Sequence, residues 1–75
     1  MKLYIFDVLN KTQAVNKTYW INFRRSLSLG EWPANVLREE YNATLHTKYD
    51  IEHGVLPHIE FENEKDAVIF SLRFS

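Results

Sequence analysis

The stretch PHIEFENEKDAVIFSLRF, residues 57–74, decides the fold, because it contains one clear strand pattern and one segment that can either coil or extend. At its start, Ile59 and Phe61 alternate with the polar residues His58, Glu60 and Glu62. Alternation with a period of two is typical of a strand with one buried face. We therefore expect a short strand over 57–62, with Ile59 and Phe61 facing the core.

The second part of the stretch begins at Asn63, a residue type that caps helices, and acidic side chains follow it where a first turn would lie. Ala67, Phe70 and Phe74 then recur at helical spacing, but every second residue from 68 to 74 is also apolar, as in a strand. The acidic start favours a helix over 67–74. The alternative is that this C-terminal segment forms a fourth strand.

A longer helix is expected upstream, over Glu31–Tyr49. Pro33 is tolerated in its first turn, because the amides there have no intrahelical partner to lose. Four apolar residues recur at intervals of four and would line one buried face. These residues are Leu37, Tyr41, Leu45 and Tyr49.

The N-terminal third is expected to form a hairpin. Lys2–Leu9 is rich in strand formers and apolar on both faces, which suits a central strand, and the polar segment Asn10–Lys17 would be the loop. Thr18–Arg25 is ambiguous, because its apolar residues fit both the strand period and a helical stripe. Its composition favours a second strand.

These elements give the order β-β-α-β-α, a small two-layer α+β fold, and the length allows one domain over residues 1–75. A short chain buries a small fraction of its surface, so each large side chain matters. The expected core is apolar and drawn from all five elements. Its members are Leu3, Ile5, Ile21, Phe23, Val36, Leu37, Tyr41, Leu45, Ile59, Phe61, Phe70 and Leu72.

Composition limits the setting in which the protein works. Cysteine is absent, which excludes disulfides and thiolate zinc sites and indicates a reducing compartment. The apolar N-terminal run is broken by Asp7, unlike a signal peptide, and no stretch approaches the ~20 apolar residues of a membrane span. We expect a cytoplasmic protein without a membrane partner.

The run Ile59–Phe74 resembles the C-terminal ends of small uncharacterised proteins encoded by tailed bacteriophages. Those ends have a strand, an acidic turn, an Asp-Ala pair, a Phe, and a final Leu, basic residue and aromatic residue. The resemblance implies a phage-encoded accessory protein that acts in the bacterial cytoplasm. The shared motif contains no catalytic residue, so it implies no active site.

Charge is divided between the two halves of the chain. Residues 1–30 carry five basic side chains and one acidic one, whereas residues 31–75 carry four basic and nine acidic ones. Such polarity concerns partners and association rather than fold. The segment 17–25 also interleaves its basic residues with aromatic ones, a mixture used by proteins that bind single-stranded nucleic acid.

Sequence motifs for catalysis or cofactor binding are missing. His46, His53 and His58 have no metal-ligand spacing, so we expect no metal site and no cofactor. The acidic residues around Glu60–Asp66 have no nucleophile or phosphate loop beside them. They are better suited to docking on a basic partner than to acid–base catalysis.

Two functional hypotheses remain. The first is a non-enzymatic protein-binding module, which can also self-associate as a two-fold homodimer. The second is a module that binds single-stranded nucleic acid through segment 17–25, although the near-neutral total charge disfavours it. For the first, the expected partner-binding residues are one aromatic and basic group and one acidic group. They are Trp20, Arg24, Arg25 and Trp32, and Glu60, Glu62 and Glu64.

Overall fold

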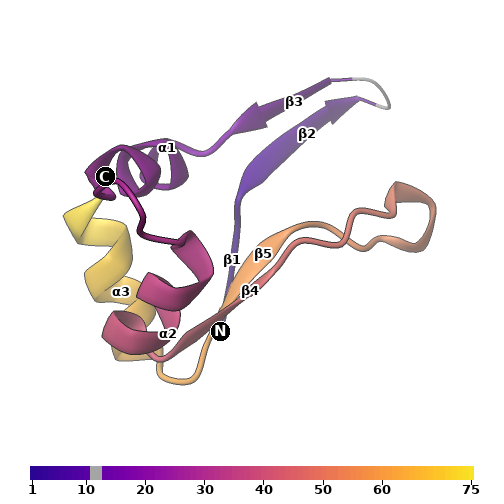
Figure 1. Ribbon diagram of the computed structural model, residues 1–75. Coiled ribbons are helices and arrows are strands. Elements are labelled where there is room, and N and C mark those ends of the chain that lie inside the picture. The colour runs from indigo at the N-terminus through magenta and orange to yellow at the C-terminus, as the bar shows by residue number, and fades with distance from the viewer. Residues whose placement is uncertain (11–12) are drawn as a thin grey trace.

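The computed structural model describes residues 1–10 and 13–75, which form an α+β fold (Figure 1). The expected fold class is confirmed, but the order is βββααββα rather than β-β-α-β-α. The strands are β1 (Lys2–Tyr4), β2 (Phe6–Asn10), β3 (Gln13–Asn16), β4 (Ala43–His46) and β5 (His58–Phe61). The α-helices are α1 (Thr18–Ser26), α2 (Pro33–Tyr41) and α3 (Glu64–Arg73), and a 3-10 turn, η1, covers Ile51–His53.

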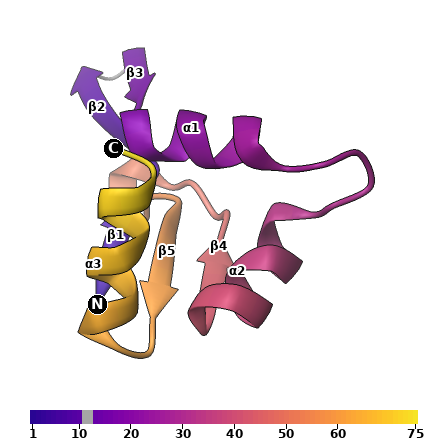
Figure 2. The same cartoon turned by 90° about the vertical axis from the view of Figure 1, so that its left-hand side faces the viewer.

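Three strands form an antiparallel sheet in the order β1-β5-β4. Leu3 and Leu45 both lie opposite Ile59 in its register. Ile59 and Phe61 are buried on the face that α2 and α3 cover, and α1 lies across one end of the sheet (Figures 1 and 2). The strand predicted over 57–62 is therefore confirmed, and it is the central one.

The expectation of one central strand over Lys2–Leu9 is wrong. β1 is an edge strand, and the chain bends at Ile5 before β2 begins. The Ile5 side chain is buried, its N–H donates to the Pro57 carbonyl at 3.3 Å, and its carbonyl accepts from the Lys17 N–H at 2.8 Å. Pro57 precedes β5 and Lys17 follows β3. The backbone therefore changes partners at Ile5, and the predicted single strand is two strands in two sheets.

After the bend, β2 pairs with β3 in a separate two-stranded sheet. β3 lies inside the segment Asn10–Lys17, which was expected to be a loop. Its polar sequence gave no strand pattern, but backbone hydrogen bonds to β2 form without apolar side chains. The part of that predicted loop at Lys11 and Thr12 lies outside the described residues. Figure 1 shows the hairpin projecting from the helical layer, to the same side as the chain between β4 and β5.

The preferred strand over Thr18–Arg25 is also wrong, since this segment forms α1. In a helix, Trp20 and Phe23 both point into the core, where the Phe23 ring lies 5.2 Å from Phe70 and 5.3 Å from Phe74. In a strand, Trp20 and Phe23 would face opposite sides. Tertiary packing therefore overrides the strand propensity of these residues.

The helix expected over Glu31–Tyr49 is only partly right, because α2 ends at Tyr41. Asn42 adopts a left-handed conformation with φ of 50° and ψ of 45°, and the chain then continues as β4. Leu37 and Tyr41 are buried from the helix, as predicted, but Leu45 reaches the core from a strand. The spacing of four was therefore coincidental beyond residue 41.

The helix expected over 67–74 is confirmed as α3, and the alternative of a fourth strand is wrong. Asn63 occupies the N-cap position, although its side chain donates to Asp66 Oδ2 at 3.2 Å rather than to a backbone group. The sequence also placed Leu72 in the core, and this is wrong, because the side chain is 73% exposed. Leu72 lies on the outer face of α3.

Phe70 is at the centre of the core. Five aromatic rings surround it, with centroids 4.9–6.2 Å away: those of Tyr19, Phe23, Tyr41, Phe61 and Phe74. Most of the expected core residues are buried or packed against this cluster, and Ile21 lies at its edge, half-buried. Trp20, Ala43, Ala67 and Phe74 are also buried, although the expected core did not include them.

Candidate functional site

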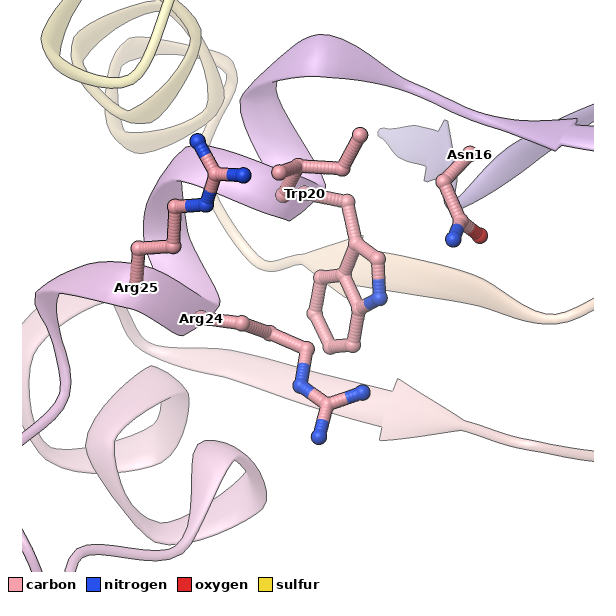
Figure 3. A pocket seen from close by; sticks show the side chains of 5 residues that line it. Asn16, Trp20, Arg24 and Arg25 are labelled. Atoms are coloured by element: carbon pink, nitrogen blue, oxygen red, sulfur yellow. The ribbon is translucent and has the colours of Figure 1, made fainter.

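The basic residues of the predicted site lie on α1. Arg24 and Arg25 belong to its last turn and are exposed, a placement that the partial negative charge at a helix C-terminus favours. Trp20 is only 8% exposed. Figure 3 shows its indole ring beside the Arg24 guanidinium, with the ring nitrogen on the side of Asn16 and the Arg25 side chain directed away from the ring. These side chains and Ile21 line an open hollow of about 350 Å³.

Trp32 is the most exposed aromatic side chain of the predicted site, at 71%. It occupies the N-cap position of α2 with extended backbone angles, φ −100° and ψ 130°. Its backbone carbonyl accepts hydrogen bonds from the Asn35 and Val36 N–H groups, so the start of the helix does not depend on the indole ring. The ring is left free to contact another molecule.

A tight turn precedes Trp32 and displays Leu29. The Ser28 N–H donates to Glu31 Oε1 at 2.6 Å, and the Glu31 N–H donates to the Ser28 carbonyl at 3.1 Å. Gly30 supplies the positive φ, 89°, that such a turn requires at its third residue. Leu29, at the second residue of the turn, is fully exposed. Figure 2 shows this connection extending beyond both helices.

We refer to Arg24, Arg25, Leu29 and Trp32 as the α1–α2 surface. The four residues come from the last turn of α1 and the connection that follows it. Tryptophan and arginine are the residue types most enriched among energetically dominant interface contacts. Leu29 was not identified from the sequence, where Gly30 was the only signal of a turn at this point.

Two of the predicted acidic residues, Glu62 and Glu64, lie at the end of α3 that is farther from α1. Asn22 Nδ2 on α1 donates to the Phe74 carbonyl at 2.8 Å, so the C-terminal end of α3 meets α1. Glu62 and Glu64 lie at its N-terminal end and are exposed. Ten helical residues separate the two ends by about 15 Å. The basic and acidic groups therefore do not form one site.

Glu60 is also separated from the other two acids. It lies in β5 on the open face of the sheet, opposite Lys2 on one side and Thr44 on the other. Its Oε2 atom is buried and has no hydrogen-bond partner among the described residues.

The same open face carries a row of rings that the sequence did not reveal. Tyr4 and His46 lie on either side of His58 in the register. The His46 and His58 rings stack with centroids 4.6 Å apart, and the Tyr4 ring lies 5.9 Å from His58. The row depends on strand register, which period-two patterns alone do not fix.

The third histidine, His53, lies apart from the stacked pair of His46 and His58. His53 Nδ1 lies 2.6 Å from Asp50 Oδ2, outside the ring row. Among the described residues, no three histidine, cysteine or carboxylate side chains group closely enough to hold a metal ion.

Two side chains of segment 17–25, those of Lys17 and Tyr19, bind to other residues of the protein itself. Lys17 Nζ lies 2.9 Å from Asp7 Oδ1, and this hydrogen-bonded pair raises the pKa of Lys17. The Tyr19 hydroxyl donates to the Tyr4 carbonyl, and burial raises the pKa of Tyr19. Since Phe23 is also buried, the rings of this segment mainly hold the fold together.

No known protein family, no curated protein and no solved structure matches the chain. Within the part of the chain that the structure describes, no helix is both long and apolar enough to cross a membrane.

Proposed function

We propose that the protein is a small non-enzymatic protein-binding module that holds its partner at the α1–α2 surface. The observation that carries this proposal is the exposure of the Trp32 side chain, which is 71%. Trp32 follows a turn that is held by two hydrogen bonds between Ser28 and Glu31. A constrained connection loses little conformational entropy when its side chains become ordered on binding. The exposed guanidinium groups of Arg24 and Arg25 suit a partner surface that is apolar at its centre and acidic around it.

The resemblance of residues 59–74 to phage proteins extends the proposal. On this basis the protein is a phage-encoded accessory protein that acts in the bacterial cytoplasm and modulates or inhibits a host or phage enzyme. Glu60, Glu62 and Glu64 stay predicted partner-binding residues. Because they lie away from α1, they would contact a different region of the partner from the one at the α1–α2 surface.

The first experiment is affinity capture from a bacterial lysate with quantitative mass spectrometry, followed by titration of the retained protein. Trp32→Ala is expected to weaken its binding about 30-fold, the effect of a contact worth about 2 kcal/mol. Leu9→Ala is the matched control, because Leu9 is 62% exposed on the hairpin. Equal capture by the wild type and Trp32→Ala would contradict the proposal.

A second candidate function, binding of single-stranded nucleic acid, rests on the hollow beside Trp20. Two exposed guanidinium groups and the Asn16 carboxamide surround it, and these groups can hold phosphates. The test is binding to single-stranded DNA and RNA at roughly 50 mM salt. Loss of binding in Arg24→Ala/Arg25→Ala, with full retention in Trp32→Ala, would favour this function over the first.

A further inference from the structure

Helix α3 has two apolar faces. Ala67, Phe70 and Phe74 are buried against the rest of the protein. Val68, Ile69 and Leu72 lie on the opposite side of the helix and are 46%, 44% and 73% exposed. We call these three residues the α3 stripe. A helix that is apolar on both sides is usually covered on both sides, but Figure 2 shows α3 on the outside of the helical layer.

Charged residues lie at both ends of the α3 stripe: Glu64, Lys65 and Asp66, with a net charge of −1, at its N-terminal end, and Arg73 at its C-terminal end. Asp66 and Arg73 are seven residues apart, which is about two helical turns, so both lie along the same side of the stripe. Asp66 Oδ2 accepts hydrogen bonds from Asn63 and Asn42, and the Arg73 guanidinium lies 5.7 Å from the centre of the Phe74 ring. Neither residue forms an ion pair within residues 1–10 and 13–75.

We propose that a second copy of the chain covers the α3 stripe through antiparallel packing of two α3 helices around a two-fold axis close to Ile69. Reversing the helix direction about this axis places Val68 of each copy against Leu72 of the other. It also places Asp66 of each copy beside Arg73 of the other. The contact therefore matches apolar positions with apolar positions and Asp66 with Arg73, as a two-fold interface requires.

Charge decides between antiparallel and parallel packing. In a parallel pair the two-fold axis would run along the helices, so the side of the stripe that carries Asp66 and Arg73 would lie on opposite sides of the contact in the two copies, and neither charge would meet its opposite. A parallel pair would also align the helix dipoles, whereas antiparallel packing opposes them.

The size of the contact sets its strength. Two helices of ten residues bury less than the ~1,600 Å² of a standard interface, so the dimer is weak and concentration-dependent. The α3 stripe contains none of the residues of the α1–α2 surface. The dimer therefore does not depend on the proposed partner function, and either can fail alone.

The test uses two charge-reversal variants of the full chain, Arg73→Asp and Asp66→Arg, in sedimentation velocity from low micromolar to near-millimolar protein. Each variant alone brings like charges together at both ends of the stripe and is expected to dimerise at least about 10-fold more weakly than the wild type. Mixed in equal amounts, they restore both attractive pairs and are expected to form a heterodimer close to wild-type strength.

Arg24→Asp is the matched control, because it makes the same charge change on α1 and should leave dimerisation unchanged. Leu72→Glu tests the apolar part of the stripe without altering the hydrogen bonds of Asp66, and it should abolish the dimer while circular dichroism shows an intact fold. A wild-type chain that is monomeric throughout, a mixture no tighter than its separate components, or an unaffected Leu72→Glu dimer would each overturn the proposal.

Discussion

Single side chains connect elements that are distant in this short chain, and Tyr19 is an example. Its ring lies 6.2 Å from Phe70 in the core, while its hydroxyl donates to the Tyr4 carbonyl in β1. Burial raises its pKa because the phenolate is poorly solvated there, although the nearby Lys17 charge partly opposes this shift. The fold therefore needs the neutral phenol.

This requirement predicts a loss of stability at alkaline pH. Because the pKa of Tyr19 is higher in the folded than in the unfolded state, its contribution is complete below the ordinary value of 10.0 and is lost as pH rises through the folded pKa. Tyr19→Phe should cost about 1 kcal/mol at neutral pH, for the lost hydrogen bond, but should flatten the decline above pH 10.0.

Urea denaturation of both proteins across this pH range measures the difference. Lys17, whose pKa is raised mainly by its hydrogen bond with Asp7, loses its stabilising charge in the same range in both proteins. Most of this contribution is common to the two proteins, because Tyr19 is the smallest cause of the Lys17 shift. An identical alkaline decline in the wild type and Tyr19→Phe would show that Tyr19 does not cause it.

At the level of elements, the sequence predicted the segments that carry a local signal, such as an alternating pattern or a cap. β5 and α3 follow one another, and the strand pattern with its acidic continuation was enough to place both. α1 was missed because its apolar residues fit two periods, and only the position of Phe70 decides which one is buried. The exposure of Leu72 has a similar cause. In a strand it would share a face with Phe70 and Phe74, whereas in α3 it lies on the opposite side of the helix from them.

Asn42 is the point at which the predicted long helix ends. Its left-handed backbone, with φ of 50°, stops α2 and directs the chain into β4. Asparagine and glycine adopt this region more readily than other residues, whereas a Cβ-bearing residue such as alanine is strained there. The apolar spacing of four continues past Asn42 and therefore predicted a longer helix than the backbone allows.

The strain predicts a difference between two substitutions at this position. Both Asn42→Ala and Asn42→Gly remove the 3.5 Å contact from Nδ2 to Asp66, so their difference isolates the backbone conformation. Asn42→Gly is expected to be about 1 kcal/mol more stable than Asn42→Ala. Chemical denaturation measures this, and an alanine variant as stable as the glycine variant would show that the conformation carries no strain.

At the scale of the whole molecule, the candidate sites follow from how the elements face one another. Trp32, Arg24 and Arg25 were predicted as partner-binding residues, and all three are exposed. The burial of Trp20, the α3 stripe and the ring row at His58 were not predicted, because each depends on a helix direction or a strand register. Exposed residues are therefore easier to identify from this sequence than the surfaces they form together.

The two sheets should also differ in stability. All four residues of β3 are exposed, and the hairpin is tied to the body by the bond between Lys17 and Ile5, the Asp7 ion pair and a ring contact of 5.8 Å between Phe6 and Tyr49. β5, by contrast, is bonded on both sides and buried beneath the helices. We expect the hairpin to open locally while the rest stays folded.

Native-state hydrogen exchange followed by NMR tests this expectation. Amide protons bonded between β2 and β3 should be protected at least about 10-fold less than those of β5, and denaturant should affect their exchange little, because local opening exposes little surface. The amides of β5 should exchange only through global unfolding and respond steeply to denaturant. If both sets exchange with one protection factor and one denaturant dependence, the hairpin unfolds together with the core, and the few contacts at its base couple it fully to the rest of the protein.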